Sequence, residues 1–170
     1  ANPLYDNLIG EHATNDACFL RQPGKPAVSF RQFSERTSQV ANLLLKHGLK
    51  PGDRVAVQAS KTIEMVILYG ATIQAGGVFL SLNTDYKKDE ISYFIKDASP
   101  KIFVCDPQKR KELGDIADQV GSQVLTLDKD GQGSLQSQAN ILSKTFNTID
   151  RGPDDLVALL YTSGTTGRSK

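Results

Sequence analysis

The sequence predicts an α/β protein built on an open, mainly parallel sheet flanked by helices. Short apolar runs, each typical of a buried strand, alternate with longer segments whose apolar residues recur at helical spacing. The connections between them are short, and strands joined through a helix run parallel with right-handed crossovers. A chain of 170 residues with 39% hydrophobic residues is large enough to bury a core against such a sheet.

The first unit begins with a short strand at 27–30. The helix that follows is capped by Ser29 and Gln32 together, which have capping-box spacing, and Gly48 ends it. A turn then leads into a strand at 54–59.

The second helix is predicted to be deeply packed. Ser60 caps it, and it extends to about Gln74 with apolar residues around most of its circumference. These residues are Ile63, Met65, Val66, Ile67, Leu68 and Ile73. A strand at 78–82 follows.

Two further units complete the regular part of the chain. The third helix has four apolar residues on one face and ends before Pro100. They are Ile91, Phe94, Ile95 and Ala98. After a strand at 101–105, Asp106 is predicted to cap a helix with Pro107 at its first position, and a strand at 123–127 follows.

The pattern weakens after residue 127. We expect an α/β core at about 1–127, a weakly patterned connection at 128–154, and a strand with a phosphate-binding loop at 155–170. Asp128 and Asp130 suggest a calcium site, but the spacing and closing glutamate of an EF-hand are missing. A solvated turn is therefore favoured.

The last fifteen residues predict a ligand site. Residues 156–161 form a continuous apolar run, which indicates a buried strand that we expect at the centre of the sheet. Only Thr, Ser, Gly and Arg then follow until Lys170. Glycines let backbone N–H groups approach an anion, hydroxyls add donors and the lysine adds a charge. A strand that leads into such a loop predicts polyphosphate binding beyond the carboxyl end of that strand.

This loop is not the common P-loop, because its glycines lie too close together and Arg168 follows Gly167. Instead, Tyr161-Thr-Ser-Gly-Thr-Thr-Gly-Arg-Ser-Lys170 resembles the phosphate loop of the adenylate-forming acyl-CoA synthetases. Ser169 stands where that family usually has proline.

The resemblance covers nearly the whole chain. Segments 49–57 and 76–83 are also similar to that family, with Ser81 where proline is usual. Asn83-Thr84-Asp85-Tyr86 resembles its malonyl-CoA synthetase branch in particular.

The resemblance implies a two-step ligase. A carboxylate such as malonate attacks the α-phosphate of ATP, which gives an acyl-adenylate and diphosphate, and coenzyme A then displaces AMP to give a thioester. It implies that Mg²⁺ accompanies ATP and that coenzyme A binds outside this chain. Lys170 would stabilise phosphate charge as a catalytic residue, Thr162 would also face the magnesium ion, and Gly164 and Gly167 would give the backbone room. The residues expected to contact the nucleotide phosphates are Thr162, Ser163, Thr165, Thr166 and Lys170.

On this resemblance, residues 1–170 are an incomplete amino-terminal domain, inactive alone and with exposed apolar surface that favours self-association. Two other functions stay open, a stand-alone nucleotide- or anion-binding module and a non-catalytic interaction domain. A fatty-acid–CoA ligase is a further alternative.

Composition argues against other partners. A formal charge of +1 spread over both signs gives no field that attracts nucleic acid or a membrane surface. Isolated Cys18 and Cys105, together with a start that lacks a secretory signal, favour a reducing cytoplasm. His12 and His47 have no partners at matching spacing, so neither is expected to be catalytic.

Overall fold

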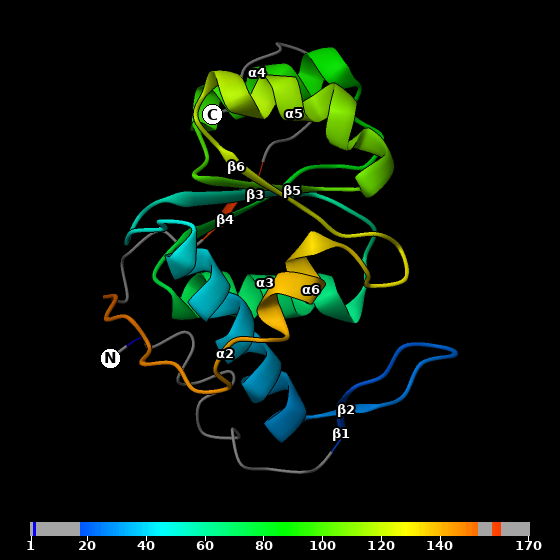
Figure 1. Cartoon of the computed structure of the whole chain (residues 1–170), viewed down its shortest axis with the longest axis vertical. Coiled ribbons are helices and arrows are strands. Elements are labelled where there is room, and N and C mark those ends of the chain that lie inside the picture. Colours follow the sequence, from blue (N-terminus) through cyan, green and yellow to red (C-terminus); the bar gives the residue numbers. More distant parts are fainter. Residues whose placement is uncertain (1, 3–17, 153–157, 161–170) are drawn as a thin grey trace.

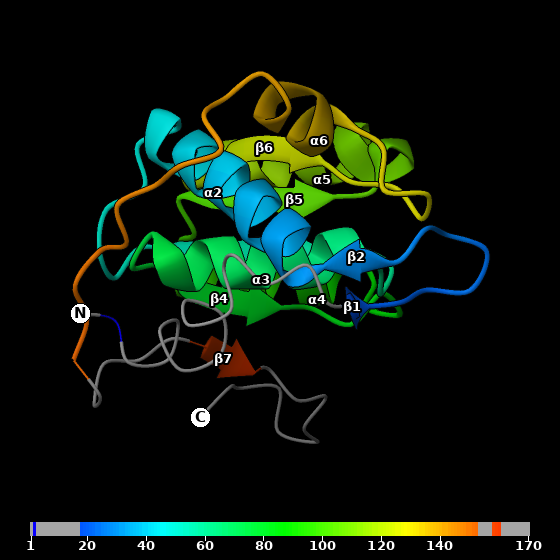
Figure 2. The ribbon, with the colours of Figure 1, turned by 90° about the horizontal axis from the view of Figure 1, so that it is seen from below.

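Five parallel strands form the sheet at the centre of the computed structural model, which describes residue 2, residues 18–152 and residues 158–160. Their order across the sheet is β6-β5-β3-β4-β7, and every neighbouring pair is parallel (Figures 1 and 2). The predicted α/β class is therefore confirmed. The strands are β3 (Arg54–Gln58), β4 (Val78–Ser81), β5 (Ile102–Cys105), β6 (Gln123–Thr126) and β7 (Ala158–Leu160).

Helices cover both faces of this sheet. Figure 1 shows α4 and α5 above it, and α2, α3 and α6 below it. The helices are α2 (Phe30–Lys46), α3 (Ile63–Gln74), α4 (Lys88–Ala98), α5 (Arg110–Gln119) and α6 (Ser134–Ala139), with a 3₁₀ turn η2 (Pro107–Lys109) before α5. A short antiparallel hairpin of β1 (Cys18–Leu20) and β2 (Val28–Ser29) precedes α2.

The two faces of the sheet belong to two separate apolar clusters. In β3, Val55 and Val57 face the cluster formed with α2, α3 and α6, whereas Ala56 faces the cluster formed with α4 and α5. All three are fully buried. Burial on both faces explains why these strands are continuous apolar runs rather than alternating ones.

Local capping follows the sequence at several helix ends. Ser29 Oγ accepts from the backbone N–H of Gln32, and Gln32 Oε1 accepts from the backbone N–H of Ser29, which confirms the capping box. Asp106 caps η2 as expected. The expected cap of α3 was wrong, because Thr62 rather than Ser60 accepts from the N–H of Met65.

Burial of the helices differs from the sequence prediction in α3. The four apolar residues expected on one face of α4 are all buried. Val66 of α3, however, is 38% exposed, so that helix does not pack on all sides. Helix α6 was not predicted, because its Ser- and Gln-rich sequence has little apolar periodicity and Gly133 gives it no side-chain cap. Two of its residues, Leu135 and Ala139, nevertheless join the core beside α2.

Strand β7 lies at an edge of the sheet, where it pairs with β4, and the expectation of a central strand was wrong for the described residues (Figure 2). A continuous apolar run indicates that both faces of a strand are covered. It does not report whether a second strand pairs on the other side, and this explains the error. No helix in the described ranges is long and apolar enough to cross a membrane.

Candidate functional site

The five strands of the sheet end side by side, and the chain leaves each of them along one rim, which we call the carboxyl edge. Ligands of open parallel sheets bind outside such an edge. The register pairs Ser81 of β4 with Leu160 of β7, so the turn after β4 and the chain after β7 start from neighbouring positions. The predicted phosphate loop begins directly after Leu160.

The predicted site residues lie outside the described residues. These are Thr162, Ser163, Gly164, Thr165, Thr166, Gly167 and Lys170. Their assigned roles, including that of Thr162 toward a metal ion, stay predictions. Within the described part of the chain, no group of three or more His, Cys, Asp or Glu side chains could hold a metal ion.

Gln58 ends β3 at the carboxyl edge and ties that strand to the turn after β4. Its Nε2 donates to the carbonyl oxygens of Asn83 at 2.9 Å and of Tyr86 at 3.3 Å. The side chain is 2% exposed, and its Oε1 is a buried acceptor without a hydrogen-bond partner. A buried amide that donates to two carbonyls of another segment is a strong positional constraint, because loss of the donor removes both of these hydrogen bonds.

The turn at 83–86 has several further internal constraints. Asn83 Oδ1 accepts from the N–H of Asp85 at 2.9 Å, and the Asn83 carbonyl accepts from the N–H of Tyr86 at 3.1 Å. The ring of Tyr86 packs against that of Phe94 in α4, with the centroids 5.0 Å apart. These contacts restrain the conformation of the turn and anchor it on α4.

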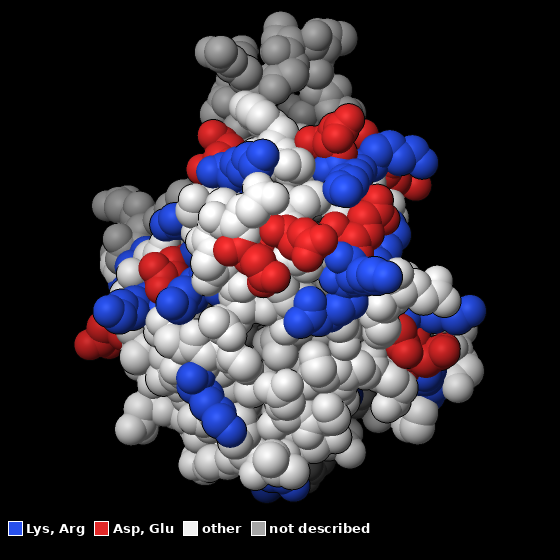
Figure 3. Space-filling model, turned by 45° about the horizontal axis from the view of Figure 1, so that its top comes forward, with Lys and Arg blue, Asp and Glu red and all other residues white. Residues whose placement is uncertain are grey.

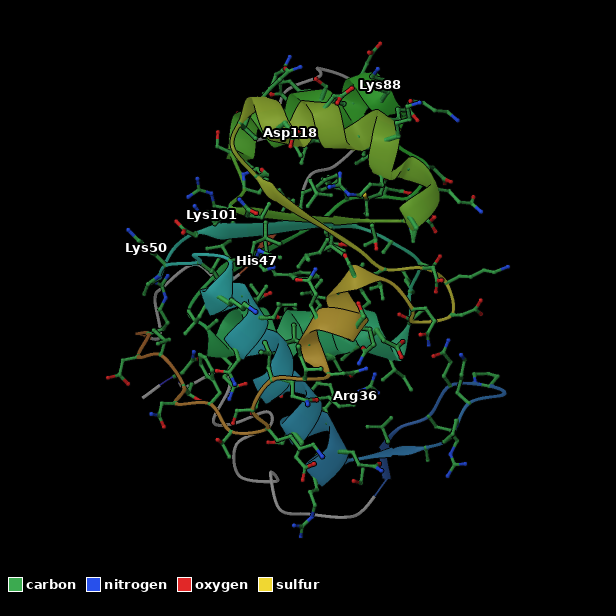
Figure 4. The ribbon with its side chains drawn as sticks, in the orientation of Figure 1. Arg36, His47, Lys50, Lys88, Lys101 and Asp118 are labelled. Atoms are coloured by element: carbon green, nitrogen blue, oxygen red, sulfur yellow. The ribbon has the colours of Figure 1, made fainter. Side chains whose placement is uncertain are left out.

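Three lysines gather around this turn in a cavity of about 190 Å³, which we call the lysine pocket. Lys87 and Lys88 come from the start of α4, where Figure 4 labels Lys88, and Lys109 comes from η2. Asp85 and Glu112 also line it, so the lining has an excess of one positive charge. The lining also includes Gln58, Thr84, Tyr86 and Leu113.

A larger cavity, of about 600 Å³, lies between the β1–β2 hairpin, α2 and the start of α3. Four of its five charged side chains form two ion pairs, and the fifth, Lys25, donates to the Asp130 carbonyl at 3.3 Å. Arg36, labelled on α2 in Figure 4, contacts Glu64 at 3.2 Å, and Lys144 contacts Glu35 at 3.7 Å. The two ion pairs compensate each other, and with Lys25 the lining has an excess of one positive charge, the same as that of the lysine pocket.

Cys105 and His47 lie in structural rather than catalytic surroundings. Burial raises the pKa of the Cys105 thiol to about 11, against a smaller opposing effect of Arg110, so this cysteine is a poor nucleophile. His47 forms the C-cap of α2, and its Nε2 lies 3.1 Å from Gln138 Oε1 of α6. Figure 3 shows acidic and basic side chains interspersed over the upper half of the molecule, without a field of one sign on this face.

Comparison with known proteins identifies the family. The sequence profile described as "AMP-binding enzyme" matches residues 11–170. The chain belongs to the AMP-binding enzyme family. The α/β sheet with helices on both faces agrees with this assignment, because solved AMP-binding family structures superpose on nearly the whole chain.

MatB from Rhodopseudomonas palustris is among the most similar solved structures of this kind. Its apo form is 47% identical, with a TM-score of 0.92 over 95% of this chain. Its ATP-bound form is 48% identical, with a TM-score of 0.94 over 98% of this chain. The present chain spans 32% and 33% of those two chains.

Curated relatives include peptide synthases. Tyrocidine synthase 2 of Brevibacillus parabrevis is 36% identical over 84% of this chain. Enterobactin synthase component F of Escherichia coli O157:H7 is 30% identical over 96% of it. The chain spans only 4% and 12% of those two proteins.

Sequence reasoning missed two features of this AMP-binding chain at the carboxyl edge. Lys87, Lys88 and Lys109 were given no role, and the first two are exposed, but all three line one pocket. Gln58 was included in a strand without a role of its own. A glutamine inside an otherwise apolar strand end was the available signal, since a buried amide needs partners.

Proposed function

We propose that the complete protein containing this chain is an ATP-dependent acyl-CoA ligase, and that its acid is malonate. The single observation behind this proposal is the 48% identity to ATP-bound MatB over 98% of the chain. The similarity of Asn83-Thr84-Asp85-Tyr86 to the malonyl-CoA synthetase branch supports the choice of acid.

In the proposed reaction, a carboxylate oxygen of the acid attacks the α-phosphorus of ATP. The bond from that phosphorus to the bridging oxygen breaks, and diphosphate leaves. The thiol of coenzyme A then attacks the acyl carbon, loses its proton, and displaces AMP to form the thioester.

The predicted phosphate loop would act in the first step. Its hydroxyls, backbone N–H groups and Lys170 would bind the β- and γ-phosphates and stabilise the charge that develops on the leaving diphosphate. When bound, Mg²⁺ would neutralise part of the same charge, and Thr162 is the residue of this chain proposed to face it. Gly164 and Gly167 would allow the backbone to approach the phosphates closely.

A peptide synthase adenylation module is the main competing function, because it is the activity class that the curated relatives' names indicate. The acyl-CoA ligase is favoured because identity to MatB is higher, at 48% against 36%, and extends over more of the chain. A fatty-acid–CoA ligase differs from the proposal only in the acid.

Exchange of labelled diphosphate into ATP by the complete protein tests the proposal. We expect exchange that depends on malonate, and malonyl-CoA when coenzyme A is added. Acetate, a long-chain fatty acid and a panel of amino acids serve as competing substrates. Preference for a fatty acid or an amino acid would identify a different acid, and lack of exchange with every acid would contradict an adenylate-forming activity.

We further propose that residues 1–170 alone form no thioester and self-associate. Positioning of two reactants supplies ~7–11 kcal/mol of barrier lowering, and a third of a MatB-like chain lacks most of it. Turnover by residues 1–170, or a monomeric mass in solution, would contradict the respective half of this proposal.

A further inference from the structure

We propose that the loop at 128–134, which we call the edge loop, covers the free edge of β6 and prevents β6 from pairing with the same strand of a second copy of this protein. The edge loop joins β6 to α6 (Figure 1). Among the described strands, β6 ends the sheet and pairs only with β5. An open strand edge offers unpaired backbone donors and acceptors to any other strand. This role of the edge loop is independent of the ligase activity proposed above.

Two residues of β6 point their backbone groups away from the sheet. The N–H groups of Gln123 and Leu127 donate toward β5, at 2.9 Å each. Because the backbone groups of successive residues alternate between the two sides of a strand, those of Val124 and Thr126 face the free edge. These are the groups that a further strand would use for pairing.

The edge loop occupies the carboxyl half of this free edge. Ser134 Oγ accepts from the N–H of Thr126 at 2.9 Å, and Thr126 Oγ1 accepts from the N–H of Ser134 at 2.9 Å. Further along, the N–H of Asp128 donates to the Gln132 carbonyl at 2.8 Å. As the position along the chain rises from 126 to 128, that of its partner falls from 134 to 132. The edge loop therefore takes the place of an antiparallel neighbour of β6.

Gly133 and Ser134 are adapted to this cover rather than to the start of α6. A Cβ on Gly133 would overlap the outward carbonyl of Thr126, and the φ of Gly133, +136°, favours glycine. The backbone of the edge loop thus lies directly on the strand edge. Helix α6 has no side-chain cap, whereas the hydroxyl of its first residue, Ser134, accepts from β6. A loop that only joined β6 to α6 would need neither contact.

A second copy of β6 is the strand that the edge loop excludes. Two copies related by a two-fold axis would present the same edge to each other, and their β6 strands would pair antiparallel. Such a pairing could begin at Val124, which the edge loop leaves uncovered. It could extend to Thr126 only if the edge loop moved away, because Ser134 already occupies that N–H. A pairing limited to one outward residue is too short to hold two molecules together.

The solution mass of the complete protein, measured by analytical ultracentrifugation over a range of concentrations, tests this role. Gly133→Ala places a Cβ on the Thr126 carbonyl and should displace the edge loop, and Ser134→Ala removes the hydroxyl that covers the Thr126 N–H. We expect a concentration-dependent species of twice the parent's mass in Gly133→Ala, and less of it in Ser134→Ala. Val124→Pro removes an outward N–H that β5 does not use, so its addition to Gly133→Ala should restore the parent's mass.

Gly121→Ala is the matched control, because Gly121 lies just before the same strand with a φ of +73° and open space around it. This change strains the backbone but leaves the edge loop in place, so the variant should keep the parent's mass. The parent's mass in Gly133→Ala, equal association of Gly121→Ala, or association that persists after Val124→Pro is added would each overturn the proposed cover. If Gly133→Ala does not fold, Ser134→Ala decides in its place, alone and with Val124→Pro.

Discussion

Arg36 Nη2 donates to Glu64 Oε1 at 3.2 Å, and this ion pair joins α2 to the first turn of α3. The same carboxylate lies directly over Gly131, in the turn between β6 and α6. Gly131 has a φ of +81°, and a Cβ on it would overlap the Glu64 carboxylate. The Glu64 carboxylate therefore occupies the space that a side chain at position 131 would need, which explains why a glycine is found there.

Gly131→Ala should destabilise the fold through both strain and overlap. The left-handed backbone alone costs an alanine roughly 1–2 kcal/mol, and displacement of the partly exposed Glu64 from Arg36 adds about 0.2–1 kcal/mol. Gly24→Ala is the control, because Gly24 has a φ of +73° with open space around it. Urea denaturation should give a larger loss for Gly131→Ala. In a Glu64→Ala background, Gly131→Ala should cost no more stability than Gly24→Ala does. A larger cost of Gly131→Ala in that background would contradict the overlap with Glu64.

Two amides of α2 hold the irregular segment after α6, and we expect them to contribute unequally. Gln39 Nε2 donates to the carbonyls of Asn140 and Leu142, and Asn42 Nδ2 donates to those of Ser143 and Thr145. Gln39 is buried, whereas the bonds of Asn42 face solvent.

Gln39→Leu should therefore cost about 1–2 kcal/mol of unfolding free energy, because two partly buried hydrogen bonds are lost. Asn42→Ala should cost about 0.5–1 kcal/mol, since water can replace its amide. Hydrogen exchange and urea denaturation measure both effects. Equal losses of unfolding free energy in the two variants would show that burial of the hydrogen bonds does not determine how much each amide stabilises the fold.

Cys105 should make the stability of the fold depend on pH in the alkaline range. Burial raises the pKa of this thiol from 9.0 to about 11, so the folded state binds its proton more tightly than the unfolded state. The protonated thiol makes its full contribution to the free energy of unfolding below pH 9, and this contribution is lost as the pH rises from 9 to 11. Cys105→Ala should show a shallower fall of stability over this range. Parallel curves for the variant and the parent would contradict the shift.

Lys170→Ala in the complete protein should slow adenylate formation. Loss of a charge-assisted contact that matters mainly in the transition state costs ~2–4 kcal/mol, or roughly 30- to 1000-fold in rate. The melting temperature should stay within about a degree of the parent. Lys111→Ala, at an exposed position of α5, is the control. Diphosphate exchange by Lys170→Ala at the parent's rate would remove the role given to this lysine.

Elements with local signals could be predicted from the sequence. The capping box of Ser29 and Gln32 and the Asp106 cap are chemistry within one turn of helix, and both form as expected. The apolar stripe of α4 likewise defines its buried face. The parallel topology followed from the order of strands and helices, because short crossovers permit few alternatives.

Features that depend on distant contacts could not be predicted. Helix α6 gains its stability by packing on α2, which its own sequence does not report. The exposure of Val66 depends on which neighbours cover α3. At the site, the phosphate loop stays a prediction that rests on ten consecutive residues, whereas the hydrogen bonds of Gln58 depend on carbonyls contributed by the turn after another strand.

The position of β7 in the sheet also affects the order in which the strands of this protein can pair during folding. β7 pairs with β4, and the two strands are separated in sequence by residues 82–157, which include helices α4, α5 and α6 and strands β5 and β6. Pairings between segments so far apart form late in folding, because the loop between them must close first. During synthesis, β7 also leaves the ribosome after all the other described strands. The edge beside β4 thus stays unpaired until then, and binding of ATP by the loop after β7 would stabilise only molecules in which this last pairing has formed.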